Sequence, residues 1–201
     1  MNIVNTREHY ESLIAEGNDP FLDPPALQRY MSNWDGPLFY EALTPSPKSV
    51  LEIGIGTGRV ATHILQSGCD SLVGIDISPL TLERASWNLR PHSNVEFVHA
   101  DICDFIRPDT FDLAYSVLTF MHIEDKEQAF RNIYASLKLG GYLILSVSKD
   151  SEWFEFNDRK LQLYPASVDT YRQLYKQTGF LLEMVEETES KYATIMKGKK
   201  I

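Results

Sequence analysis

The chain has 201 residues, of which 43% are apolar and 23% charged, and 19 basic against 28 acidic side chains give a formal net charge of −9 at pH 7. This composition predicts a folded globular protein and excludes a disordered or fibrous chain. The acidic excess argues against a surface built to bind nucleic acid, because phosphate binding depends on clustered lysine and arginine. We therefore expect a small-molecule partner.

Neither a membrane span nor an export signal is predicted. No apolar run approaches the roughly 18 residues that a spanning helix needs. Charged side chains interrupt residues 1–17, where a signal peptide would be apolar, so we expect a cytoplasmic protein. The two cysteines, Cys69 and Cys103, show no metal-type spacing, and neither a disulfide framework nor a metal site is expected.

From about residue 48 the sequence alternates short apolar runs with segments of helical periodicity, as expected for parallel strands joined by crossover helices. The run 111–118 is nearly unbroken, which favours a central strand buried on both faces. The predicted strands are residues 50–53, 71–76, 95–100, 111–118 and 142–147. Helices are expected after Gly58, from the cap Ser78, from Asp125 to the pair Gly140 and Gly141, and from Ser167 to Gly179.

The chain ends with two apolar runs, 180–185 and 192–196, that are too close together for a crossover helix. We expect them to pair antiparallel as a hairpin. Neither an internal repeat nor an interdomain linker is found, so the sequence predicts a single α/β domain. Its expected parts are an N-terminal helical cap at 1–47 with a loop at 44–47, a ligand-binding half at 48–148, and an insert, helix and closing hairpin at 149–201.

The first strand leads into a glycine cluster, Gly54, Gly56 and Gly58, and then into a helix. Free backbone N–H groups at such a helix N-terminus can bind an anionic ligand group, although a glycine turn can also be purely conformational. A dinucleotide fingerprint requires glycine or alanine three positions after Gly56, where Arg59 stands. This spacing argues against a nicotinamide dinucleotide, and the lack of a Gly-Lys-Ser/Thr string excludes a phosphate-binding P-loop.

Two aspartates stand at the ends of the next strands. Asp76 follows Gly54 by 22 residues, about the interval at which an acidic side chain reaches ribose hydroxyls in a doubly wound fold. Asp101 follows the third strand, where its carboxylate can accept a hydrogen bond from an exocyclic amine such as that of adenine. Either residue alone is equally consistent with a loop or helix-cap aspartate. Their joint occurrence after the glycine cluster favours a nucleoside site.

Five segments in a fixed order carry a family resemblance. They are VLEIGIGTGR (residues 50–59), GIDIS (74–78), VHADICDF (98–105), FDLAYSVLTFMHI (111–123) and LKLGGYLILSV (137–147). Together they resemble the class I S-adenosylmethionine-dependent methyltransferases, over residues 48–148 and again at the closing hairpin. The resemblance implies a Rossmann-like doubly wound sheet of seven strands, five parallel and two in the hairpin, with helices on both faces.

The same resemblance implies S-adenosyl-L-methionine as the cofactor. In that family Asp76 would bind the ribose hydroxyls, Ile77 would pack on the adenine, and Val117 would face the sulfonium end. The physics of the ligand agrees, because its carboxylate suits the N–H groups of the glycine turn and its cationic groups suit acidic surroundings. The full implied cofactor set is Glu52, Gly54, Gly56, Thr57, Gly58, Asp76, Ile77, Asp101, Ile102, Ser116 and Val117.

Methyl transfer from a sulfonium has its leaving group in place, so positioning of the acceptor can supply much of the rate enhancement. His122, just past the fourth strand, is the histidine expected to face the crevice. It is either a general base, for an acceptor that must lose a proton, or a positioning residue that transfers none. Tyr30, Trp34 and Trp153 are candidate acceptor-binding residues, with core packing as the alternative for the first two.

The resulting interpretation is an enzyme that methylates a small-molecule acceptor, whose identity and acceptor atom the sequence does not determine. One alternative is a catalytically silent cofactor-binding or scaffold module of the same fold. Another is an NAD-dependent oxidoreductase, which the positions of Gly58 and Arg59 oppose. The basic C-terminal residues Lys197, Lys199 and Lys200 are interpreted as a solvated tail rather than as a nucleic-acid site.

Overall fold

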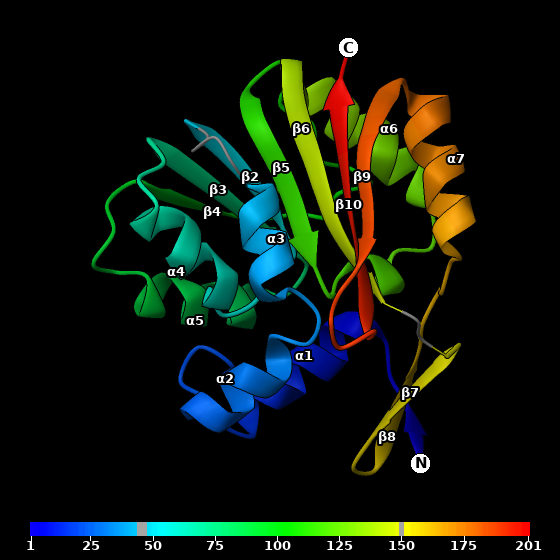
Figure 1. Ribbon diagram of the computed structural model, residues 1–201. Coiled ribbons are helices and arrows are strands. Elements are labelled where there is room, and N and C mark those ends of the chain that lie inside the picture. The colour runs from blue at the N-terminus through cyan, green and yellow to red at the C-terminus, as the bar shows by residue number, and fades with distance from the viewer. Residues whose placement is uncertain (44–47, 149–150) are drawn as a thin grey trace.

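The computed structural model describes residues 1–43, 48–148 and 151–201, so the loop expected at 44–47 lies outside the described residues. Its main sheet has seven strands in the order β4-β3-β2-β5-β6-β10-β9 (Figure 1). Strands β4, β3, β2, β5 and β6 are paired in parallel, and β10 is antiparallel to both of its neighbours. The predicted doubly wound α/β sheet with a closing hairpin is confirmed.

The parallel strands follow the apolar runs of the sequence closely. They are β2 (Ser49–Ile53), β3 (Ser71–Asp76), β4 (Val95–His99), β5 (Phe111–Val117) and β6 (Leu137–Ser148). β5 occupies the centre of the sheet, as the unbroken apolar run predicts. Its residues Leu113 and Tyr115 face one apolar layer while Phe111 and Ala114 face the other.

Helices cover both faces of this sheet (Figure 1). On one face lie α3 (Gly36–Ala42), α4 (Arg59–Gln66) and α5 (Pro79–Asn88), and on the other lie α6 (Lys126–Ser136) and α7 (Val168–Thr178). α5 begins where the sequence predicts, because the Ser78 hydroxyl accepts a hydrogen bond from the Thr81 N–H at 3.1 Å. None of the helices in the described ranges is long and apolar enough to cross a membrane.

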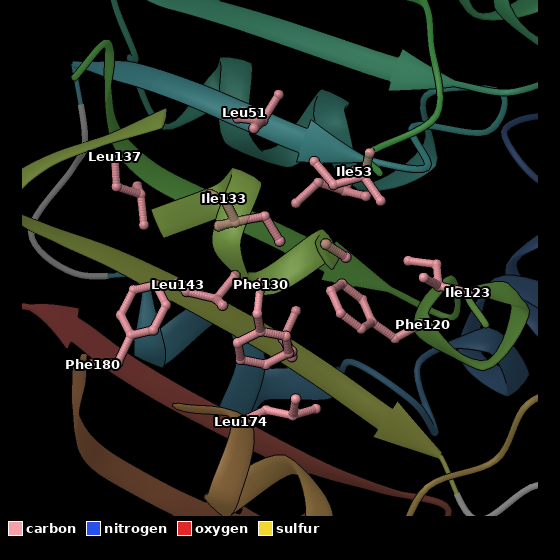
Figure 2. Packing of buried hydrophobic residues seen from close by; sticks show 14 of the residues in the cluster. Leu51, Ile53, Phe120, Ile123, Phe130, Ile133, Leu137, Leu143, Leu174 and Phe180 are labelled. Atoms are coloured by element: carbon pink, nitrogen blue, oxygen red, sulfur yellow. The ribbon is translucent and has the colours of Figure 1, made fainter. Parts of the chain in front are cut away.

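An aromatic layer joins α6 and α7 to the sheet. Figure 2 shows Phe120, Phe130 and Phe180 in this layer together with Leu143 and Leu174. The ring of Phe130 is fully buried, with its centroid 5.8 Å from that of Phe120 and 5.1 Å from that of Tyr175, in edge-to-face geometry. This layer holds the turn after β5 in place, because Phe120 belongs to the 3-10 turn η1 (Phe120–His122).

The predicted closing hairpin is confirmed as β9 (Phe180–Glu187) and β10 (Ala193–Lys200). The interpretation of its last lysines as a solvated tail is wrong. They belong to β10, and the Lys200 ammonium donates to the carbonyl oxygens of Tyr134 and Leu137 at 2.9 and 2.6 Å. The Lys197 ammonium likewise donates to the Ala42 carbonyl, at 2.7 Å. These lysines fasten helix ends to the sheet.

The helix expected to run to Gly140 and Gly141 is shorter than predicted. α6 ends at Ser136, and β6 begins directly at Leu137 and continues through both glycines. The carbonyls at the end of α6 need no glycine cap, because the Asp109 and Thr110 N–H groups donate to those of Ala135 and Ser136. Gly140, with a φ of +81°, instead belongs to an irregularity in the pairing of β5 with β6.

A second, three-stranded sheet was not predicted. It has the order β1-β8-β7 and joins β1 (Asn2–Ile3) to a hairpin of the insert, β7 (Trp153–Phe156) and β8 (Arg159–Gln162). Buried Arg159 secures this contact, since its Nε donates to His9 Nδ1 at 3.2 Å and its guanidinium pairs with Glu16. In Figure 1 this sheet lies with α1 (Thr6–Ala15) and α2 (Pro25–Met31) beyond the carboxyl ends of the parallel strands.

Truncating Phe130 tests the importance of the aromatic layer. We expect Phe130→Ala to lower the free energy of unfolding by about 3–5 kcal/mol, because the lost ring leaves a cavity that its neighbours cannot fill. Urea denaturation followed by circular dichroism measures this change. Leu139→Ala is the control, because the Leu139 side chain is 78% exposed and its loss should cost within about 0.5 kcal/mol. Equal effects of the two substitutions would contradict the assignment.

Candidate functional site

A cavity of about 590 Å³ lies at the carboxyl edge of the parallel strands. The turns that follow β2, β3, β4 and β5 form most of its wall, and the start of α1, the η1 turn and Tyr164 complete it. Ligand sites of doubly wound sheets occur at this edge, because the strand ends meet there and leave a crevice. The turns contribute residues 52–57, 75–77, 100–103 and 117–119.

The glycine turn after β2 has a shape that other residues would not allow. Gly54 has a φ of +72°, and a Cβ atom at this position would overlap the Thr119 side chain of the turn after β5. Gly58 is the N-cap of α4 with a φ of +93°, and it offers no side-chain cap to the first N–H groups of that helix. The turn therefore lies against the turn after β5 and leaves helix N–H groups open to a ligand.

Asp76, at the end of β3, connects two of the turns. Its Oδ2 accepts a hydrogen bond from the Gly56 N–H at 3.0 Å and its Oδ1 accepts one from the Ser78 N–H at 3.0 Å. Burial raises the pKa of this carboxyl group, while these backbone hydrogen bonds act in the opposite direction. Each carboxylate oxygen can accept a further hydrogen bond. Asp76 therefore shapes the glycine turn and can still accept from a ligand diol.

Glu52 lies in the floor of the cavity and is 3% exposed. The Tyr115 hydroxyl donates to its Oε2 at 2.7 Å. Burial raises the pKa of Glu52 to about 8, although the hydrogen bond from Tyr115 and the charge of Arg59 act to lower it. Arg59 is engaged elsewhere, in an ion pair with buried Asp35 at 2.8 Å. Glu52 forms no ion pair within residues 1–43, 48–148 and 151–201, and a buried acid of this kind favours a ligand group of positive charge.

The remaining predicted cofactor residues divide into two groups. Ile77, Asp101, Ile102 and Val117 line the cavity, and Asp101 Oδ1 accepts the Cys103 N–H at 2.8 Å. Ser116, by contrast, lies behind the wall, where its buried hydroxyl donates to the Ile53 carbonyl at 2.9 Å. The structure thus gives Ser116 a role in joining β5 to β2.

Thr57 connects the glycine turn to the N-terminal cap. Its hydroxyl accepts a hydrogen bond from the Phe21 N–H at 3.3 Å, and its carbonyl accepts one from the Asn88 side chain at 3.0 Å. The same Asn88 amide donates to Asp19 Oδ2 at 3.1 Å. These bonds hold the segment that follows α1 against α5 and place Pro20 in the cavity wall.

His122 lines the cavity, and the Tyr10 hydroxyl lies 2.9 Å from its Nε2. Its Nδ1 is buried and has no hydrogen-bond partner among the described residues. Burial, together with the charges of His9 and Lys126, lowers the pKa of His122 to about 4. The imidazole is therefore neutral at pH 7. A base so weak is poorly matched to proton abstraction at that pH, and the geometry favours the positioning role.

The three candidate acceptor-binding aromatics lie away from the cavity wall. Tyr30 is 52% exposed and packs edge-to-face on Trp34, whose ring also contacts Tyr192. Trp153 lies on β7 beneath the Lys160 ammonium, at 4.6 Å. From α2 it is Met31 that reaches the cavity. Contact of the three aromatics with an acceptor stays a prediction.

Sequence reasoning missed Tyr10 and Tyr164, which both line the cavity. Tyr10 reaches it because the β1-β8 pairing and the Arg159 contacts place α1 over the strand ends. Tyr164 is placed by a hydrogen bond from its N–H to the Met121 carbonyl at 2.7 Å. No local pattern marks either residue, since both positions depend on contacts between segments far apart in the chain.

Comparison with protein families finds one matching model, described as a methyltransferase domain, over residues 51–145. Among curated proteins, malonyl-[acyl-carrier protein] O-methyltransferase 1 of Ilyobacter polytropus is 30% identical over 118 residues, which are 58% of this chain and 44% of that protein. Phosphoethanolamine N-methyltransferase 1 of Arabidopsis thaliana is 30% identical over 172 residues, which cover 79% of this chain and 34% of that protein. The chain spans less than half the length of these two relatives.

Solved structures show the same fold. A putative S-adenosylmethionine-dependent methyltransferase from Listeria monocytogenes has a TM-score of 0.75 at 20% identity, with 86% of this chain and 98% of that one covered. The N-methyltransferase NodS of Bradyrhizobium japonicum, in complex with S-adenosyl-L-homocysteine, has a TM-score of 0.74 at 17% identity, with 98% and 99% covered. The similarity therefore extends over the cap and the closing hairpin.

The lowered pKa of His122 predicts that the free energy of unfolding depends on pH. The pKa of His122 is about 4 in the folded protein, against about 6.5 when unfolded, so the unfolded chain binds more protons between these values. Its contribution to stability is complete above pH 6.5 and declines as the pH falls towards 4. Between pH 6.5 and 4.5 the wild type should lose about 2 kcal/mol more than His122→Gln. Urea denaturation of both proteins across this range measures the difference, and parallel curves would contradict a buried neutral imidazole.

Proposed function

Residues 51–145 match the methyltransferase-domain family, and on this premise we propose that the chain is an S-adenosylmethionine-dependent methyltransferase that transfers a methyl group to a small-molecule acceptor. The observation that carries the proposal is the cavity in which the glycine turn, Glu52, Asp76 and Asp101 meet. The relatives act, by their names, on small acceptors such as phosphoethanolamine. A cytoplasmic location stays a prediction.

The cavity residues fit the cofactor group by group. The open N–H groups at the start of α4 suit its carboxylate, and buried Glu52 suits its ammonium. Asp76 is placed to accept from the ribose hydroxyls. Asp101, with Ile77 and Ile102, would border the adenine. The carboxylate, ammonium, ribose and adenine of the ligand then each have a protein group of matching chemistry.

When bound, the cofactor would supply a methyl group on a sulfonium, open to attack at carbon by an acceptor lone pair with the neutral thioether as the leaving group. The chain's own task is to place the acceptor in line and to exclude water. The wall formed by Val117, Leu118 and Ile123 is apolar. His122, whose Nε2 lies 2.9 Å from the Tyr10 hydroxyl, would hold that hydroxyl in place beside the acceptor. Its use as a base stays a prediction.

The NAD-dependent alternative gains nothing from the structure. Arg59 occupies the position at which a dinucleotide site has its third small residue, and it is committed to Asp35. The catalytically silent module remains distinguishable by experiment, because it predicts cofactor binding without turnover.

Cofactor binding is the first test of the proposal. S-adenosylhomocysteine at 100 times its dissociation constant should stabilise the protein by about 2.7 kcal/mol, whereas NAD at the same concentration should not. Asp76→Asn should weaken binding at least tenfold, because the amide replaces an acceptor of two backbone N–H groups and of the ribose. Asp70→Asn, at an exposed residue before β3, is the matched control.

Thermal shift and isothermal titration calorimetry give both measurements. Stabilisation by NAD without stabilisation by S-adenosylhomocysteine would contradict the proposal. Binding with no S-adenosylhomocysteine formed from S-adenosylmethionine over a panel of amines, phenols, thiols and carboxylates would favour the silent module.

Glu52 makes cofactor binding depend on pH. With a pKa of about 8 the carboxyl group is mostly protonated at pH 7, and an arriving ammonium favours its ionised form. Binding of S-adenosylhomocysteine at pH 7 should therefore release close to one proton, and affinity should rise between pH 7 and 8. Calorimetry in two buffers of different ionisation enthalpy measures the release. Glu52→Gln should abolish it, and an unchanged release would exclude Glu52 as its source.

A further inference from the structure

We propose that the acceptor is a small amine, held through its ammonium form by Glu124 with the rings of Tyr10 and Tyr164, and that carboxylate acceptors are excluded. The inference rests on the proposed methyl transfer and deepens it by naming the acceptor class. It distinguishes methylation of nitrogen from methylation of oxygen, and the similar curated proteins include both O-methyltransferases and N-methyltransferases.

The cavity has an end that the cofactor-binding turns do not form. The start of α1 contributes Thr6, Arg7 and Tyr10, and the junction of η1 with α6 contributes residues 122–125. Tyr164 closes this end, held to η1 by its hydrogen bond to the Met121 carbonyl. Val117, Leu118 and Thr119, which come directly before η1 in the chain, line the same cavity. This acceptor end is therefore the place where a second substrate can meet the methyl group.

Each described cation near the acceptor end already has partners. Arg7 Nε pairs with Glu11 at 2.8 Å. The residue Lys126 is 7% exposed, and its ammonium donates to the carbonyl oxygens of Ile123 and Tyr164 at 2.6 and 2.5 Å. His122 adds no positive charge at neutral pH, because burial lowers its pKa to about 4. A bound carboxylate would share the exposed Arg7 guanidinium with Glu11 or displace the carbonyl partners of Lys126.

Negative charge and aromatic rings are what the acceptor end offers instead. Glu124 lines this end and is exposed to solvent. Desolvation raises the pKa of the Tyr164 hydroxyl, and so do the charge of Glu124 and the hydrogen bond between Tyr164 and Glu124. Asp125, beside it, caps α6 by accepting the Gln128 N–H at 2.8 Å. An ammonium gains from carboxylates and from the faces of tyrosine rings, whereas a carboxylate would lose water and meet like charge.

The transfer step balances with an amine and needs no further reactant. The ammonium first loses a proton to solvent. The neutral nitrogen lone pair then forms the new C–N bond as the S–CH3 bond breaks, and the electron pair of that bond remains on sulfur. The product is a more substituted ammonium and a neutral thioether. Tyr10 and His122, joined at 2.9 Å, face this nitrogen without taking part in the proton balance.

The test uses the full chain saturated with S-adenosylhomocysteine and two probes of matched shape and opposite charge, 2-phenylethylamine and 3-phenylpropionate. Calorimetry or ligand-observed NMR gives the dissociation constants. We expect the amine to bind at least tenfold more tightly than the carboxylate. Glu124→Gln should weaken amine binding at least fivefold and leave S-adenosylhomocysteine binding unchanged. Glu127→Gln is the matched control, because Glu127 is an exposed residue of α6 that pairs with Arg131.

Three results would overturn the inference: equal or tighter binding of 3-phenylpropionate, no binding of either probe, or an amine affinity that Glu124→Gln does not change. In each of these cases the S-adenosylhomocysteine titration stands separately and still supports the cofactor site. Failure of S-adenosylhomocysteine itself to bind would instead count against the proposed function, and with it against the acceptor class.

Discussion

The carboxylate of Asp76 is the contact on which the geometry of the cavity depends. By accepting the N–H groups of Gly56 and Ser78 it joins the turn after β2 to the start of α5. Two parallel strands end side by side here, and their turns would otherwise be free to separate. Because Gly54 has no Cβ, the turn after β5 also closes against the same glycine turn. The Asp76 carboxylate and the lack of a side chain at Gly54 thus bring the ends of β2, β3 and β5 together.

Electrostatics then divide the cavity into two ends with different tasks. Near the glycine turn a buried acid, Glu52, has only a neutral hydrogen-bond donor, Tyr115, while the neighbouring Arg59 is committed to Asp35. At the other end the basic residues Arg7 and Lys126 are committed to protein oxygen atoms. Both ends therefore hold carboxylates, and their basic residues already contact protein oxygen atoms. The proposed binding of cationic ligands at both ends agrees with the net charge of −9.

The sequence predicted the main sheet well, because its strands are short apolar runs and its helices have local caps such as Ser78 and Ser167. It also placed Asp76 and Asp101 at strand ends that prove to line the cavity. It failed where distant segments decide the outcome. The end of α6 is set by N–H groups of residues 109 and 110 rather than by its own glycines. The β1-β8 pairing, and with it the place of Tyr10, follows from no local pattern.

The second sheet has a consequence for the order in which the protein can assemble. Arg159 and His9, which hold it together, are 150 residues apart in the chain. Contacts of such long sequence separation form late, because the entropy of closing the intervening loop must be overcome first. During synthesis on the ribosome, β2 to β5 can pair before β8 has been synthesised. The carboxyl ends of these strands would then be exposed before the β1-β8-β7 sheet forms. The wall that brings Tyr10 to His122 can therefore be completed only after β8 has been made.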